Sequence, residues 1–93
     1  MEFGANIEAR NVYLWTPLDS CSKVGWLPVA KILLNNGAPV DAADKVKTTP
    51  LHLAAKYGNP KLASLLMKHG ASVQQRDSSG FNVLETAILY KQR

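Results

Sequence analysis

Residues 49–55 of this chain read Thr-Pro-Leu-His-Leu-Ala-Ala. The Thr49 side chain can accept a hydrogen bond from the free N–H groups at the start of a helix. Pro50 suits the first helical position, because it lacks an N–H that would have no partner there and its φ angle is already helical. Gly58 is a residue type that ends helices. The stretch therefore predicts a helix over residues 50–57, with Thr49 as its cap.

A second helix is expected directly after the first. Leu62, Leu65 and Leu66 fall at positions i, i+3 and i+4, which is one face of a helix. Residues 60–69 are therefore predicted to be helical, and Gly70 ends the helix. Residues 71–81 then combine short apolar and polar alternation with the turn residues Asp-Ser-Ser-Gly at 77–80, which is typical of an extended, hairpin-like loop.

The chain repeats this pattern with a period of 33 residues, without insertion or deletion. Glycine followed by alanine recurs at Gly4, Gly37 and Gly70. The same spacing relates three further sets, each of one chemical type: Thr16, Thr49 and Asn82; Leu18, Leu51 and Leu84; Cys21, Ala54 and Ala87. A fixed period of this length indicates a repeat architecture. It predicts further first helices at 17–24 and 83–90, and another second helix at 28–36 with Val29, Ile32 and Leu33 on its apolar face.

The middle unit, with residues 49–55, Gly58 and the run His-Gly-Ala at 69–71, resembles an ankyrin repeat, whose period and Thr-Pro-Leu-His-x-Ala signature it shares. The resemblance covers residues 4–93. The flanking units depart from it, because residues 16–19 lack the histidine and residues 82–85 lack the threonine, proline and histidine. The fold that the resemblance implies is all-α: an ankyrin-repeat solenoid of helix-turn-helix units, joined by hairpin-like loops, the fingers.

About two full repeats and two partial ones are expected. Residues 16–48 and 49–81 are the full repeats, 4–15 the closing finger of a partial one, and 82–93 the first helix of a partial or capping one. Residues 1–3 precede the first repeated position, Gly4. One interpretation is that they are left over from cloning. Because about three units are usually needed for stability, the chain is interpreted as a piece of a longer array. A natural miniature capped by the polar residues 91–93 is the alternative.

Composition excludes several classes of protein. With 93 residues the chain has room for one small domain, and its single cysteine excludes an internal disulfide. This favours a reducing compartment, so the expected localisation is the cytoplasm, with the nucleus as the alternative. No apolar run approaches 18 residues, and the first residues do not resemble a signal peptide, so no membrane insertion of this segment is expected. The net charge of +4 favours acidic partners only slightly.

The residues with reactive side chains have structural interpretations. The resemblance implies that His52 bridges neighbouring fingers by hydrogen bonds, and His69 suits the C-terminal end of a helix. Cys21 shares its lattice position with two alanines, which predicts a buried, inert thiol. The glycines are dispersed by the repeat and form no phosphate-binding loop. We therefore expect no enzyme, no cofactor and no metal site.

The candidate site is a surface that binds another protein. The resemblance implies binding through the finger tips and the exposed side of the first helices. Positions there that vary between units carry aromatic residues and lysines, a mixture suited to hot spots and to the steering of acidic partners. The candidate partner-binding residues are Tyr13, Trp15, Lys23, Lys45, Val46, Lys56, Tyr57, Ser78, Phe81 and Tyr90. For Trp15 and Phe81, packing between neighbouring fingers is an equal alternative.

The expected function is that of a scaffold or adaptor module that binds a protein without chemistry. The first alternative is a structural segment in the cytosolic array of a larger protein, such as a membrane channel, without its own partner. Nucleic-acid binding through Lys23, Lys45, Lys47 and Lys56 is a second alternative that the small net charge disfavours. Apolar residues at both ends of the array also predict self-association, with a dimer favoured over open-ended stacking.

Overall fold

The structure is a computed structural model that describes residues 10–12 and 14–91, with side chains described as far as residue 89. This part of the chain contains five α-helices and no strand. They are α1 (Pro17–Val24), α2 (Leu27–Asn35), α3 (Pro50–Lys56), α4 (Pro60–Lys68) and α5 (Val83–Lys91). The all-α prediction is confirmed, and each helix lies within two residues of its expected position.

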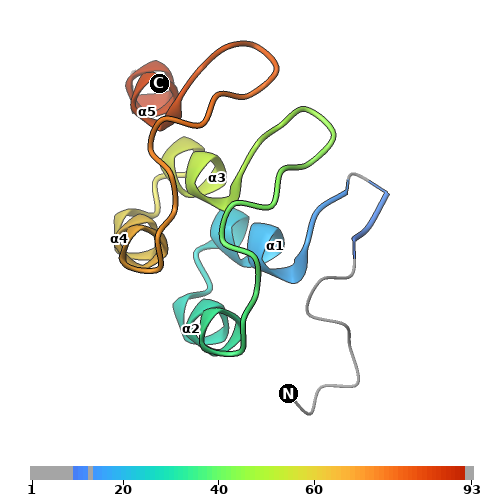
Figure 1. The fold of residues 1–93 in the computed structure, drawn as a ribbon. Helices are drawn as coiled ribbons and strands as arrows, with labels where there is room; N and C mark the ends of the chain where they lie inside the picture. The colour runs from blue at the N-terminus through green and yellow to red at the C-terminus, as the bar shows by residue number, and fades with distance from the viewer. Residues whose placement is uncertain (1–9, 13, 92–93) are drawn as a thin grey trace.

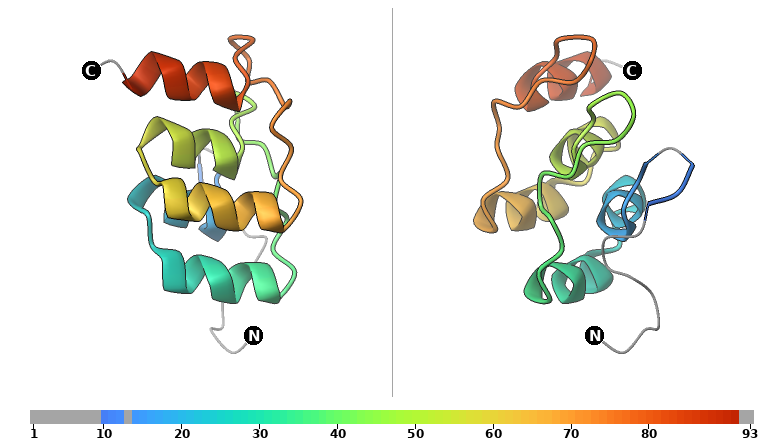
Figure 2. Two further views of the ribbon diagram at one scale, coloured as in Figure 1. Left: turned by 90° about the vertical axis from the view of Figure 1, so that its left-hand side faces the viewer. Right: turned by 45° about the vertical axis from the view of Figure 1, so that its right-hand side comes forward.

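The helices stack in two rows. Figure 1 shows α1, α3 and α5 side by side in one row, called the front row below, with α2 and α4 in a second row. The two fingers, residues 36–49 and 69–82, project to the same side of the stack, and so does the segment that leads into α1 (Figures 1 and 2). The faces of the first helices and the inner sides of the fingers therefore enclose one concave surface.

Threonine caps begin the first two helices of the front row, as predicted. The Thr49 hydroxyl accepts a hydrogen bond from the His52 N–H at 3.4 Å, and His52 Nδ1 accepts one from the Thr49 N–H at 3.3 Å. Thr16 and Asp19 form the same reciprocal box, with the Thr16 N–H donating to Asp19 Oδ2 at 2.8 Å. Each box satisfies N–H groups that have no partner inside the helix.

Asp19 nevertheless sits in an unfavourable place for a charge. The residue is fully buried, and its second carboxylate oxygen, Oδ1, has no hydrogen-bond partner among the described residues. Burial raises the pKa of the Asp19 carboxyl from its ordinary 3.8 to about 6, although its hydrogen bonds with Thr16 act in the opposite direction. The buried carboxyl in the capping box of α1 therefore lowers the stability of the folded chain. The capping box of α3 has His52 in the equivalent position and holds no buried carboxylate.

Leucines between the two rows form the core. Leu18 and Leu51 of the front row are buried against Leu33, Leu62 and Leu66 of the second row. Cys21 is buried in the same cluster, as predicted.

The predicted apolar face of α2 was wrong at one residue. Ile32 is 41% exposed, whereas Leu34 is only 7% exposed and belongs to the core. Successive residues of a helix point roughly 100° apart. Ala30 and Leu33 face the core. Leu34 lies on the same side of the helix as these two residues, whereas Ile32 points away from them.

The outer face of α5 is uncovered. Leu84 is equivalent to Leu18 and Leu51 in the 33-residue repeat, yet it is 67% exposed, whereas those two are at most 1% exposed. Leu18 and Leu51 are covered by α2 and α4, the second helices of their own pairs, and α5 packs mainly on α3. Within the described residues no second helix covers α5 (Figure 2), so its apolar side chains Leu84 and Ile88 face solvent.

The turns before the first helices place a residue with a positive φ angle at the same position of each repeat. Leu14, Lys47 and Gly80 are 33 residues apart, and all three have positive φ angles, of 62°, 62° and 87°. Gly80 adopts this conformation without strain, whereas a side chain with a Cβ pays for it. The first two turns are therefore strained where the third is not.

Candidate functional site

A groove of about 710 Å³ lies between the fingers and the first helices. Its lining follows the repeat, because four of its rows are built from residues 33 positions apart. From the fingers to the far edge these rows are Asn11, Asp44 and Asp77; Trp15, Thr48 and Phe81; Ser20, Leu53 and Thr86; Lys23, Lys56 and Leu89. Successive units thus extend one continuous surface rather than each forming a separate site.

The groove brings together most of the residues that the sequence predicted for partner binding. Those that line it are Trp15, Lys23, Lys45, Val46, Lys56, Tyr57 and Phe81. Ser78 does not line it; its N–H donates to the Val46 carbonyl oxygen at 2.8 Å, and the next residue, Ser79, lines the groove instead. Tyr13 and the side chain of Tyr90 lie outside the described residues.

The floor of the groove was not among the residues predicted from the sequence. Ser20, Leu53 and Thr86 form this row. They lie three residues before Lys23, Lys56 and Leu89, and residues at i and i+3 share a helix face. The sequence therefore contained a signal for them. If Lys23 and Lys56 at the helix ends face the groove, the residues one turn earlier on the same helices are expected to face it too.

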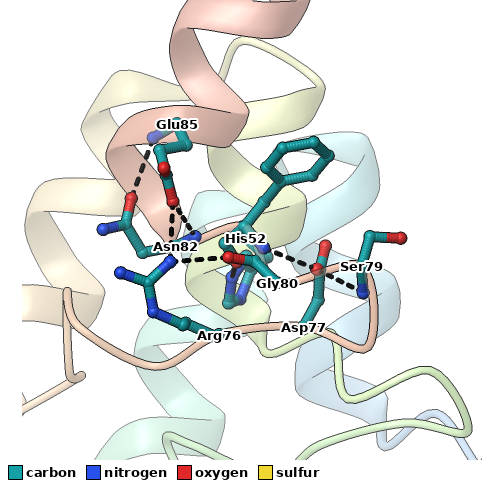
Figure 3. Close-up of polar contacts among 8 residues, drawn as sticks. His52, Arg76, Asp77, Ser79, Gly80, Asn82 and Glu85 are labelled. Atoms are coloured by element: carbon teal, nitrogen blue, oxygen red, sulfur yellow. Dashed lines mark hydrogen bonds and ion pairs between the residues drawn. The ribbon is translucent and has the colours of Figure 1, made fainter.

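Hydrogen bonds hold the finger side of the groove. Asp44 Oδ1 accepts from the N–H groups of Val46 and Thr48, both at 2.9 Å, and its Oδ2 accepts from Trp15 Nε1 at 2.8 Å. Trp15 thus joins the segment that leads into α1 to the next finger, as the packing alternative proposed, while it also lines the groove. In the last finger Asp77 Oδ1 accepts from the N–H groups of Ser79 and Phe81 (Figure 3).

The last finger is also tied to the helices on both sides of it. His52 Nδ1 accepts from Thr49, so the Nε2 atom carries the proton and donates to the Phe81 carbonyl oxygen at 3.0 Å. Arg76 donates to the Gly80 carbonyl oxygen at 2.6 Å and pairs with Glu85 at 3.1 Å (Figure 3). His52 is 1% exposed and has both ring nitrogens engaged, so its role here is structural.

Lysines and aromatic rings form the far edge of the groove. The Lys23 ammonium lies 5.6 Å from the centre of the Trp15 ring and 5.7 Å from that of Tyr57. The Lys56 ammonium lies 5.5 Å from the centre of the same Tyr57 ring. These are cation–π distances, which orient the ammonium groups against the rings.

Reactive chemistry has little support in the described residues. Burial raises the pKa of the Cys21 thiol, which disfavours the nucleophilic thiolate. No group of three or more His, Cys, Asp or Glu side chains gathers there as metal ligands would. The groove offers shape, aromatic surface and charge, which are features of binding surfaces.

Comparison with models of protein families gives a match. A family model described as ankyrin repeats, in three copies, matches residues 20–93. No curated protein matches the chain. None of the helices in the described ranges is long and apolar enough to cross a membrane.

Proposed function

Because the chain belongs to the ankyrin repeat family, we propose that it is a scaffold or adaptor module that binds another protein through the groove between its fingers and first helices. Ankyrin repeats are generally protein-interaction modules and typically non-enzymatic. The partner meets the rows of side chains that successive units contribute. We place this binding in a reducing compartment, the cytoplasm or the nucleus, because the one cysteine is a buried free thiol.

The observation that carries the proposal is the composition of the groove. Trp15, Tyr57 and Phe81 supply aromatic surface, and Val46 and Leu89 supply exposed apolar surface beside them. Aromatic residues contribute most to interface hot spots. The hydrogen bonds within and between the fingers hold this surface in place before a partner arrives, which lowers the entropy cost of binding.

Two groove variants with matched controls test the proposal. Val46→Ser removes an exposed apolar side chain in the groove, and Val24→Ser removes an even more exposed one outside it. Tyr57→Ala and Trp26→Ala form a second pair, in which only Tyr57 lines the groove. Each variant is compared with the original chain for capture of partners from a cell extract, followed by affinity measurement with each purified partner.

The groove variants are expected to lose affinity by roughly tenfold or more, as hot-spot truncations do, while the outer variants keep it. The melting temperature is measured for all four variants to separate binding from stability. Equal losses in both members of each pair, or losses only in the outer variants, would contradict the proposal.

The uncovered helix α5 favours a second candidate. An exposed leucine at a position that is buried in the two preceding units is suited to receive a further helix. We propose that this face packs on another repeat, either within a longer array or from a second copy of the chain. In the longer array the segment would have a structural role without its own partner.

A further inference from the structure

The two edges of the groove differ in charge. Its carboxylates, Asp44 and Asp77, lie on the finger side, and both accept hydrogen bonds from finger N–H groups. The ammonium groups of Lys23 and Lys56 lie at the opposite edge, in the last turns of α1 and α3. Lys45 adds a third cation near the tip of its finger. A ligand in the groove thus meets negative charge that backbone N–H groups already stabilise, and positive charge across from it.

Aromatic rings hold two of these cations. Tyr57 lies within cation–π distance of both Lys23 and Lys56, and Trp15 lies within the same distance of Lys23. A lysine side chain loses considerable conformational entropy when it is ordered. Contacts that order it in the free protein lower that cost when an anionic group arrives.

Apolar surface lies between the charged edges. Val46 and Phe81 are both partly exposed on the finger side, and Leu53 forms the floor. A bound segment can therefore place a carboxylate at the lysine edge and an apolar side chain toward the fingers.

From this charge complementarity we propose that the groove takes an acidic peptide segment of a partner protein, with carboxylates at Lys23 and Lys56 and an apolar side chain against Val46 and Phe81. The inference rests on the proposed function of the groove and adds the chemistry of its ligand.

Selection from a library of random peptides tests the inference without a known partner. The full chain is immobilised, and the enriched peptides are sequenced and synthesised. Each peptide is made with its natural sequence and with every Asp and Glu replaced by Asn and Gln. We expect the enriched sequences to carry net negative charge beside an apolar residue, and the amide versions to bind at least tenfold more weakly, as an order of magnitude for several lost charge contacts.

Lysine variants then locate the contact. Lys23→Gln and Lys56→Gln are each expected to weaken acidic peptides about threefold, and together about tenfold, with a flatter dependence on salt. Lys31→Gln and Lys61→Gln, on exposed positions of α2 and α4 outside this groove, remove the same charge and are expected to leave affinity unchanged. The melting temperature of each variant confirms that it is folded, and Lys23→Gln alone keeps the test valid if the double variant does not fold.

The outcomes separate the inference from the function on which it rests. Neutral or basic peptides that lose affinity on Val46→Ser would overturn the inference and leave the groove as a binding site. Peptides that bind equally well to Val46→Ser and to both groove lysine variants would overturn both, and so would a selection that enriches nothing. Tighter, salt-sensitive binding of a single-stranded oligonucleotide than of the acidic peptides would also overturn the inference, in favour of nucleic acid.

Discussion

Replacing Asp19 with histidine should stabilise the chain at neutral pH. Position 19 is equivalent to position 52, where His52 caps its helix and donates from Nε2 to the Phe81 carbonyl oxygen. The equivalent acceptor for residue 19 is the carbonyl oxygen of Thr48, which occupies the same place in its own finger turn: it accepts the Asp44 N–H at 3.0 Å, as Phe81 accepts that of Asp77. Asp19→His therefore places an imidazole where the repeat already offers both of its partners.

The magnitude follows from the buried carboxyl. Below pH 3.8 the folded and unfolded states both hold the proton, and the shift has no effect on stability. Between pH 3.8 and about 6 the folded chain keeps a proton that the unfolded chain releases, so the contribution to stability falls as the pH rises. Above that window the full cost is present. One pKa unit corresponds to about 1.4 kcal/mol, so the cost is about 3 kcal/mol.

The substitution removes this cost and adds a hydrogen bond worth about 1 kcal/mol, against which the larger imidazole introduces some strain. At about pH 7.5, where a histidine of ordinary pKa is neutral, we expect the free energy of unfolding to rise by roughly 2–4 kcal/mol. At about pH 4.5 the advantage should vanish, because the aspartate of the original chain is then largely protonated and the histidine is charged.

Urea unfolding followed by circular dichroism at several pH values measures this difference. Asp19→Asn is the control, because it removes the charge and keeps an acceptor for the Thr16 N–H, but it has no donor that reaches the next finger. The gain in unfolding free energy of Asp19→Asn should depend on pH as that of Asp19→His does. It should be smaller, because the asparagine lacks the added hydrogen bond. A gain that does not change with pH, or a loss of stability at pH 7.5, would show that the buried Asp19 carboxyl does not destabilise the chain.

Three further predictions concern packing, backbone strain and the open end of the stack. Leu66→Ala should destabilise the chain by about 2–5 kcal/mol in urea unfolding, and Met67→Ala, at an exposed neighbour, by about 0.5 kcal/mol or less; equal effects would contradict the assigned helix face. Lys47→Gly should raise the melting temperature, because it relieves a left-handed residue that costs about 1–2 kcal/mol, whereas Gly80→Ala should lower it; the opposite signs would show that the turn is not strained. The original chain should show a mass above that of the monomer by light scattering at high concentration, and Leu84→Gln should shift it toward monomer without lowering stability; a monomer at all concentrations would remove α5 as an association surface.

Local signals in the sequence were sufficient for the helices. The Thr-Pro caps and the glycines that follow mark helix ends through backbone chemistry alone, and the 33-residue period transfers the clear middle unit to its less regular neighbours. The period also placed most of the candidate surface, because equivalent residues of stacked units line the same groove.

Features that depend on packing were not predictable in this way. The choice of Leu34 over Ile32 for the core depends on how α2 is rotated against its neighbours, since either residue fits an apolar stripe. The raised pKa of Asp19 depends on burial that the sequence does not display. The strained turns at Leu14 and Lys47 were visible only indirectly, because their lattice equivalent is Gly80.

We propose that the groove, rather than the second row of helices, is the surface that binds a partner. It is tested most directly by amide chemical shifts of the full chain, recorded with and without the first partner or peptide shown to bind it. We expect the shifted amides to lie along the groove rows, around Ser20, Leu53 and Thr86 and in the two fingers, while the amide shifts of α2 and α4 stay unchanged. Shifts concentrated on α2 and α4, with the groove amides unchanged, would contradict it.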